Sequence, residues 1–305
     1  MRRYRFTLAI DGAFSTPPKG DTLFGQLCWS LVELEGGESL DRWLEGYTNR
    51  RPSFVVSDML AGDMVLFPPV PTAHLGIPFE AKKRKDLKRK RAITIGALEQ
   101  RDYQIDKSTR LACESHESWL TSIQMRNRID RRNDTTGNGF DPFASKRYDI
   151  CRSSATLYMV VDEKRIDLST LRKALEYIGK NGFGKDATIG RGRFTVTNVE
   201  PVSFDTEKSN ALLTLAPSVL YGQNFEEVYY EPFTRFGKHG GYLAHGRVWK
   251  NPVLMADSFA LVKTDSSSFF IGHGLGGDGT ISKRMPKTVH QGYAVTIPVR
   301  LETVQ

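Results

Sequence analysis

Alternation of apolar and polar positions at the start of the chain predicts a strand, a helix and a second strand. The first strand covers residues 3–10, and a loop of sequence FSTPPKG follows at residues 14–20. Asp21 can cap the helix, which runs from residue 22 to about residue 33 because its leucines recur on one helical face. The apolar run SFVV at residues 53–56 indicates the second strand.

A long segment from about residue 61 to residue 150 interrupts this pattern. It is irregular, basic and rich in turn formers, so we interpret it as an insertion. The regular pattern then resumes with a buried strand at 155–161 (ATLYMVV), a helix at 167–178 with apolar residues at 3, 4, 3 spacing, and a closing strand at 193–202.

The order of these elements predicts an α+β fold. Without the insertion it is strand, helix, strand, then strand, helix, strand, which is the split βαβ or ferredoxin-like arrangement that RNA-recognition modules also use. We assign this first domain to residues 1–205. Residues 206–305 contain several strand-like runs but only weak helix signals, and predict a second, degenerate α+β domain.

Charge adds a class of partner to this picture. The chain carries 43 Lys and Arg against 35 Asp and Glu, a formal net charge of +8, and a phosphate backbone rewards such an excess through counterion release. Many basic proteins bind nothing acidic, so the distribution of charge matters more. The run KKRKDLKRKR at residues 82–91 holds eight basic residues in ten, which repel one another unless an anionic partner is present. The predicted RNA contacts of this run are Lys82, Lys83, Arg84 and Lys88.

Other features argue against several classes of protein. No window approaches the ~18 uninterrupted apolar residues of a membrane span, and the N-terminal MRRYRFTLAI predicts a strand rather than a signal peptide. Three scattered cysteines are too few for a disulfide framework or a zinc site. We therefore expect a cytoplasmic protein that uses no cofactor and no metal.

The segment GFGKDATIGRGRF at residues 182–194 is the most specific feature of the sequence. Its glycines let main-chain N–H groups approach a curved anionic backbone, and its cations supply charge-assisted hydrogen bonds. Phe183 adds a face on which a base can stack. The predicted RNA-binding residues here are Gly182, Phe183, Gly184, Lys185, Thr188, Gly190, Arg191, Gly192 and Arg193.

Two other interpretations of this segment stay open. Gly179, Gly184 and Lys185 reproduce the G-x-x-x-x-G-K spacing of a nucleotide-binding P-loop. However, Asp186 stands where that motif needs Ser or Thr, and the segment leaves a helix to enter a strand, the reverse of the required order. The glycines could also serve only tight turns, although the cations between them count against this interpretation.

A glycine-rich loop before the last strand of a ferredoxin-like domain is typical of the RAMP superfamily of CRISPR proteins, which this chain resembles. Further segments, in the same order, make it similar to the fourth Csm subunit of type III-A effector complexes. These segments are FSTPPKGDTLFGQLCWSL (14–31), MVLFPPVP (64–71), the basic run, RNRIDRRNDTTGNG (126–139) and KHGGYLAHGR (238–247).

The resemblance implies a protein of two ferredoxin-like (RRM-like) domains that caps the repeat-derived 5′ tag of the crRNA, close to the target RNA. It implies no nuclease activity. It also implies two protein partners, the large polymerase-like and cyclase-like subunit and the backbone RAMP subunit, which this chain would bridge. The insertion would form a thumb-like hairpin that wedges between guide and target bases.

The resemblance assigns further residues to RNA. Arginine density supports the thumb, because guanidinium groups pair with phosphates and stack on bases, although a solvated loop would suit the same segment. The residues are Arg126, Arg128, Arg131 and Arg132 in the thumb, and Lys19, Gly20, Asp21 and Thr22 at the start of the first helix. Independently of the resemblance, His239 stands among glycines of the second domain and is a candidate RNA contact, although a structural role would suit it equally well.

Histidine positions argue against catalysis. Metal-independent RNA cleavage commonly uses a histidine base, and related RAMP endoribonucleases often place one soon after the first helix. The first histidine here is His74, and no histidines form an H-x-x-x-H pair or join cysteines at ligand spacing. We expect no enzyme activity. An endoribonuclease that processes precursor crRNA is the alternative, and a general basic interaction protein is a weaker one.

Overall fold

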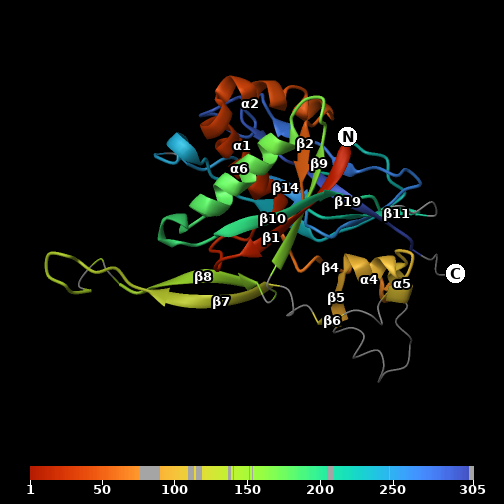
Figure 1. Ribbon diagram of the computed structural model, residues 1–305, viewed down its shortest axis with the longest axis horizontal. Coiled ribbons are helices and arrows are strands. Elements are labelled where there is room, and N and C mark those ends of the chain that lie inside the picture. Colours follow the sequence, from red (N-terminus) through yellow and green to blue (C-terminus); the bar gives the residue numbers. More distant parts are fainter. Residues whose placement is uncertain are drawn as a thin grey trace.

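The first half of the chain forms an antiparallel sheet covered by helices on one face (Figure 1). The computed structural model describes residues 1–75, 90–108, 113–114, 119–136, 139, 141–150, 152, 154–204, 209–246 and 248–301. The main elements of this half are β1 (Arg2–Ile10), α1 (Gly20–Glu35), α2 (Gly37–Leu44), β2 (Phe54–Val56), β9 (Ser154–Val161), α6 (Leu168–Asn181) and β10 (Phe194–Pro201).

The order of the strands in this sheet is β10-β1-β9-β2, and the short strand β3 (Leu60–Ala61) also pairs with β9. The central strand β1 is antiparallel to both neighbours. Numbered along the chain, the four main strands therefore lie in the order 4-1-3-2, which is the order that the predicted split βαβ arrangement requires. Apolar faces hold the helices on the sheet, since Leu23, Leu27 and Leu31 of α1 are fully buried.

Two details at the first helix differ from the prediction. The helix begins at Gly20 and its N-cap residue is Lys19, so the prediction that Asp21 caps it is wrong. The carboxylate of Asp21 instead accepts hydrogen bonds from Arg235, a residue of the second half of the chain. The short helix α2 and the turn η1 (Tyr47–Asn49) were not expected.

The insertion is more regular than its sequence suggested. One part is a small sheet with the order β4-β5-β6, accompanied by two short helices. The other part is a long antiparallel hairpin of β7 and β8, which extends away from the body of the molecule (Figure 1). The elements are β4 (Met64–Leu66), η2 (Thr72–Leu75), β5 (Lys90–Thr94), α4 (Ile95–Glu99), α5 (Ile105–Ser108), β6 (Cys113–Glu114), β7 (Trp119–Arg126) and β8 (Phe143–Ile150).

The second half of the chain is built around another antiparallel sheet, with the order β12-β15-β11-β19-β16. No α-helix lies in residues 209–246 or 248–301. The elements are β11 (Ala211–Thr214), β12 (Glu227–Tyr229), β13 (Pro232–Arg235), η6 (Gly241–Leu243), β14 (Val253–Ala256), β15 (Leu261–Lys263), β16 (Phe270–Gly272), β17 (Leu275–Gly276), β18 (Val289–His290) and β19 (Tyr293–Val299).

The two halves share one hydrophobic core. Tyr47 of the first half is fully buried and packs edge-on against Tyr293 of β19, with ring centroids 5.2 Å apart. Gln291 binds both main-chain polar groups of Val56, donating to its carbonyl at 2.8 Å and accepting from its N–H at 3.0 Å. Because buried polar groups need such partners, this contact fixes the two halves in register. Among the described residues, no helix has the length and apolar character needed to cross a membrane.

Candidate nucleic-acid interface

The segment 182–194, called the glycine loop below, leaves α6 and enters β10. Its glycines are required by its own closure. Gly182 and Gly192 have φ values of 95° and 69°, which favour glycine. A Cβ on Gly182 would lie 2.5 Å from the Arg191 carbonyl oxygen, and one on Gly192 would overlap the main chain of Phe183. The helix-to-strand direction is the reverse of a P-loop, so that interpretation is wrong.

The main chain of the glycine loop is largely committed to partners inside the protein. The N–H of Phe183 donates to Gly192, that of Gly184 to the Gln26 side chain, and that of Lys185 to the Thr16 hydroxyl. The N–H groups of residues 182 and 189–192 also have main-chain acceptors. For these residues, the prediction of a row of N–H groups that faces phosphates is wrong, because those groups close the loop.

Phe183 does not offer a surface for stacking. Its side chain is fully buried, and its ring centroid lies 6.0 Å from that of Phe14. The prediction of base stacking on Phe183 is therefore wrong. The exposed part of the loop is the stretch from Gly184 to Ile189, with Lys185 and Thr188 in solvent, and Arg193 is exposed beyond it. The loop presents cationic side chains from a closed and anchored frame.

The β7–β8 hairpin lies against this loop and is joined to it by two polar contacts. Arg126 forms an ion pair with Asp186 at 2.8 Å, and Arg191 donates to the Gln124 side chain at 2.5 Å. The hydroxyl of Ser15 donates to the same Asp186 carboxylate at 2.9 Å. Figure 1 shows the glycine loop directly beside β8. Two segments that the sequence analysis identified separately thus form one surface.

The tip of the hairpin carries the remaining thumb arginines. Arg128, Arg131 and Arg132 are all exposed. Arg132 pairs with Asp130 at 3.2 Å, and the guanidinium of Arg128 lies 5.8 Å from the ring centroid of Phe143. Exposed arginines of this kind are suited to phosphates and unpaired bases.

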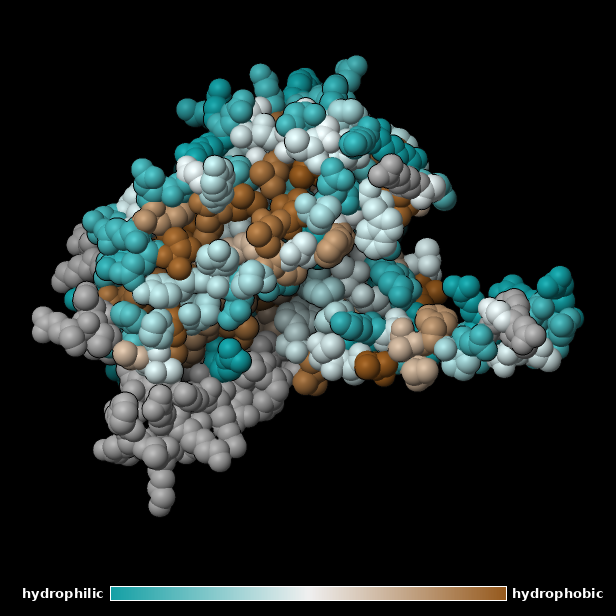
Figure 2. All heavy atoms as spheres, turned by 180° about the vertical axis from the view of Figure 1, so that it is seen from behind, coloured by the Kyte–Doolittle hydropathy of each residue, from teal (hydrophilic) through white to brown (hydrophobic). Residues whose placement is uncertain are grey.

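Apolar side chains follow one face of the hairpin between its root and its tip. Ile123 and Met125 of β7 are 70% and 63% exposed. Figure 2 shows the result, with apolar surface along the projecting hairpin and hydrophilic surface at its end. Strand alternation places these residues on the opposite face from Gln124 and Arg126, so this apolar face points away from the glycine loop.

Residues at the start of α1 join the two halves of the protein. Gly20 and Asp21 are buried, and Arg235 binds both carboxylate oxygens of Asp21 at 2.5 and 2.8 Å. Lys19 forms an ion pair with Asp257, while Thr22 is half-buried. The prediction of RNA contacts is wrong for Gly20 and Asp21 because no ligand can reach them.

Charge and burial act on Asp21 in opposite directions. Burial raises the pKa of Asp21, but the hydrogen bonds and charge of Arg235 outweigh it and hold that pKa below its ordinary value. Asp21 therefore stays ionised inside the interface. A buried charge of this kind is tolerated only because it is paired.

His239 also has a structural role. It is 6% exposed, its Nε2 lies 2.8 Å from the hydroxyl of Ser282, and burial lowers its pKa. The prediction that His239 touches RNA is therefore wrong. The predicted contacts of the basic run, at Lys82, Lys83, Arg84 and Lys88, lie outside the described residues.

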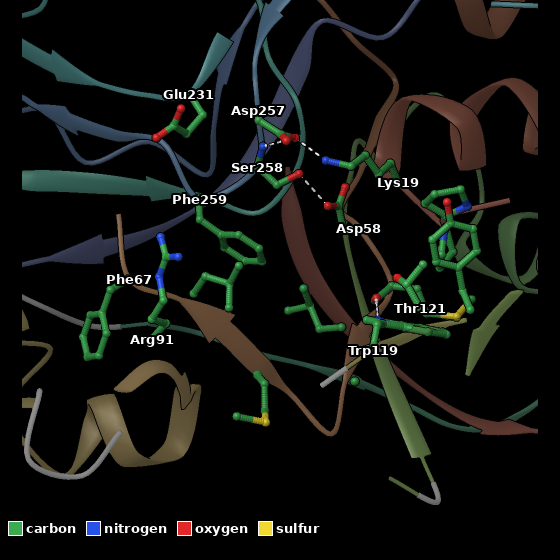
Figure 3. Close-up of a pocket in the computed structure, with 18 of the residues that line it drawn as sticks. Lys19, Asp58, Phe67, Arg91, Trp119, Thr121, Glu231, Asp257, Ser258 and Phe259 are labelled. Atoms are coloured by element: carbon green, nitrogen blue, oxygen red, sulfur yellow. Dashed lines mark hydrogen bonds and ion pairs between the residues drawn. The ribbon is translucent and has the colours of Figure 1, made fainter. Parts of the chain in front are cut away.

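A cavity of about 570 Å³ lies at the root of the hairpin (Figure 3). Its walls include Trp119 of β7, Phe259 of the second half and Arg91 of the inserted sheet. Asp58 is in its wall, where it accepts hydrogen bonds from the Gly20 N–H and the Ser258 hydroxyl. Burial raises the pKa of Asp58 to about 6. Trp119 lies on the face of β7 opposite to Arg126, so the cavity and the glycine loop flank the hairpin from two sides.

Reasoning from the sequence missed the residues that hold the glycine loop in place and join it to the hairpin. Thr16, Gln26 and Gln124 anchor the glycine loop, yet none of them was among the predicted RNA-binding residues. Their partners lie at least 67 positions away along the chain. Only folding brings such residues together, so no local signal could have identified them.

Comparison with known proteins places the fold. No protein-family model and no curated protein matches the chain. Among solved structures, a chain of the Csm1–Csm4 cassette in complex with cA4 matches with a TM-score of 0.60 and 13% identity, over 99% of both chains. A chain of the Csm3–Csm4 subcomplex in the type III-A CRISPR-Cas interference complex matches with a TM-score of 0.57 and 14% identity, over 98% of this chain and all of that one.

A chain of the Csm1–Csm4 cassette in complex with AMPPNP gives the same result, with a TM-score of 0.57 and 13% identity over the full length of both chains. Csm4 is the component that these structures have in common by name. At this level of identity the likeness shows the fold alone, over 98% or more of this chain.

Proposed function

We propose that this chain is a Csm4-like RAMP subunit of a type III-A CRISPR effector complex, and that it binds the 5′ tag of the crRNA without cleaving it. Two observations support the proposal. The first is the full-length similarity to chains of complexes that contain Csm4. The second, which carries the RNA-binding part, is the arginine-tipped hairpin joined to a cationic glycine loop through Arg126 and Asp186.

Strand order supports two related domains. In the second sheet, four of the five strands, β11, β12, β15 and β19, lie in the order 2-3-1-4 when they are numbered along the chain, and β16 adds a fifth strand beside β19. This is the 4-1-3-2 order of the first sheet read from the other edge. We infer that residues 206–305 form a second ferredoxin-like domain in which loops and short strands replace the two helices. Such a domain would have been unrecognisable from helix periodicity.

The proposed partners follow from the same comparison. The solved structures that resemble this chain contain Csm4 together with Csm1 in one case and together with Csm3 in another. For this chain, we propose that one partner is the large polymerase-like and cyclase-like subunit and the other is the backbone RAMP subunit. The chain would bridge the two in the cytoplasm while it caps the tag beside the target RNA.

An RNA-binding measurement with the purified chain tests the proposal. The triple variant Arg128→Ala, Arg131→Ala, Arg132→Ala should bind tagged crRNA more weakly than the wild type. Because each phosphate contact to a single strand adds about 0.7 to the slope of log K against log salt concentration, that slope should fall by up to about 2. Unchanged affinity and slope would contradict RNA binding at the tip.

A matched control removes three exposed cations far from the hairpin. The variant Arg2→Ala, Arg42→Ala, Lys164→Ala loses the same charge at the opposite end of the first sheet and on α2 (Figure 1). It should retain nearly wild-type affinity. Equal losses in both variants would indicate only a general effect of net charge, as expected for a basic interaction protein.

The alternative function, an endoribonuclease that processes precursor crRNA, is tested with labelled repeat RNA. We expect that purified protein leaves the RNA intact with or without divalent metal. A specific cut that persists after further purification would favour the alternative.

A further inference from the structure

The second half of the chain exposes an unusual face on the ribbon formed by β13 and β14. From residue 232 to residue 239, exposure alternates strictly, with 232, 234, 236 and 238 outward. The pairing continues past β13 through an isolated bridge between Lys238 and Trp249. The outward side chains Phe236, Trp249 and Leu254 are 64%, 57% and 71% exposed. We call this the ribbon face, defined by Phe236, Lys238, Trp249 and Leu254.

The opposite face of the ribbon fixes it to the body of the protein. Met255 and Val253 belong to a small hydrophobic cluster, against which Phe233 packs. Arg235 is held by the buried Asp21, and His239 by Ser282. The ribbon face is therefore presented on a frame whose inner side is anchored at both ends. Exposed aromatic groups on such a frame need no reordering before they contact a partner.

The charged residues of the segment that contains the ribbon are all cationic. Residues 232–256 contain four Lys and Arg and no Asp or Glu; of these cations, Arg235 is paired with Asp21 on the inner face, and Lys238 lies on the ribbon face. On the ribbon face, Lys238 Nζ lies 4.1 Å from the ring centroid of Trp249. Cations interleaved with exposed aromatic rings suit single-stranded nucleic acid, because phosphates meet the cations while bases stack on the rings. The absence of Asp and Glu from residues 232–256 favours a partner that carries negative charge, and an apolar protein surface would not require it.

Helix α1 connects this region to the glycine loop. Gln26 binds the loop through the Gly184 N–H at 3.0 Å and the Gly182 carbonyl at 3.1 Å. Trp29, one helical turn later on the same side, packs edge-on against Tyr242 with ring centroids 5.2 Å apart. Tyr242 belongs to the turn that links the two halves of the ribbon and is 66% exposed. The glycine loop and the ribbon thus flank neighbouring turns of one helix.

We propose that the ribbon face is a stacking surface for unpaired bases of the RNA strand whose backbone is bound at the glycine loop and hairpin. This inference rests on the proposed function and adds a second, sequence-tolerant contact on the second half of the chain. Phe236 and Trp249 receive the bases, and Lys238 receives a phosphate. Tyr242 extends the surface toward α1.

Tryptophan fluorescence and affinity together test this inference. The double variant Phe236→Ala, Trp249→Ala should lose at least about fivefold in affinity for an unstructured tagged RNA, as expected for the loss of one or two stacked bases. Trp249→Phe should retain most of the affinity. Fluorescence quenching on addition of unstructured RNA should be larger for the wild type than for Trp249→Phe, with little preference for base sequence.

A matched control and a comparison with the hairpin variant make the outcomes separable. Tyr221→Ala combined with Leu34→Ala removes two exposed apolar side chains elsewhere, 87% and 42% exposed, and should leave affinity unchanged. If the hairpin triple variant loses affinity while the ribbon double variant does not, the ribbon inference is overturned and the proposed function stands. If neither loses affinity, both fail.

The same variant distinguishes RNA from a protein partner. Unchanged RNA affinity together with loss of co-purifying effector subunits would show that the ribbon face binds protein, and would overturn the inference. Reduced RNA affinity of the isolated chain supports it, because no other subunit is present in that measurement.

Discussion

At the scale of single residues, burial gives neighbouring carboxyl groups different tasks. Asp21 is ionised and paired with Arg235, which ties the first helix to the second half of the chain. Asp58 lies close by and accepts two hydrogen bonds, but no bidentate cation holds its charge, and its pKa is raised to about 6. Both residues were invisible to sequence patterns as interface groups.

The raised pKa of Asp58 predicts a pH dependence of stability. Its pKa rises from an ordinary value of 3.8 to about 6 in the folded protein, so between these values the folded state binds the proton that the unfolded state has lost. The contribution of Asp58 to the free energy of unfolding must therefore fall as pH rises from about 4 to about 6.

Denaturant unfolding of the wild type and Asp58→Asn at several pH values measures this contribution. The difference in unfolding free energy, wild type minus variant, should decrease by an amount on the order of 2 kcal/mol across that interval, because the amide does not titrate. Asp63, whose pKa burial also raises to about 6, is present in both proteins and cancels. A difference that is flat or rises with pH would contradict the assignment.

At the scale of elements, the glycine loop shows which of its glycines are required by close contacts within the protein. Four of its glycines have positive φ, but they differ in their surroundings. A Cβ on Gly192 would overlap the main chain of Phe183, whereas one on Gly190 would meet nothing within 4 Å. The sequence pattern predicted that these glycines allow contact with a ligand, but part of their role is to allow close packing inside the loop.

This contrast gives a matched pair of substitutions. Gly192→Ala should destabilise the protein more than Gly190→Ala does, and the two losses in unfolding free energy should differ by about 2 kcal/mol or more. Both substitutions introduce a side chain at positive φ, but only the first adds a clash with main-chain atoms. Thermal or urea unfolding of the two variants checks this. Equal destabilisation would mean that backbone strain alone explains both glycines.

At the scale of the whole molecule, the shared core makes the two halves interdependent. Aromatic and amide contacts between Tyr47, Tyr293, Gln291 and Val56 are buried, so neither sheet can separate without exposing them. This arrangement differs from two independent domains joined by a flexible linker, which the predicted domain boundary at residue 205 would also have allowed.

A shared core predicts a single cooperative unfolding transition. The first half contains Trp29, Trp43 and Trp119, and the second contains Trp249. Fluorescence of a Trp249-only variant, with the other three tryptophans replaced by Phe, should follow the same urea transition as far-ultraviolet circular dichroism. Two separated transitions would show that the halves unfold independently.

The elements of the first sheet and the direction of the glycine loop between α6 and β10 are features that the sequence alone predicts. They are local, since they follow from periodicity and turn residues in short windows. The arginine-rich hairpin within the insertion was implied by the family resemblance and not by periodicity. The tertiary structure alone decided that Phe183 and His239 are buried, that Asp21 meets Arg235, and that the hairpin lies on the glycine loop. Such pairings join residues 60 to 214 positions apart, and only the packing of the sheets determines which distant side chains become neighbours.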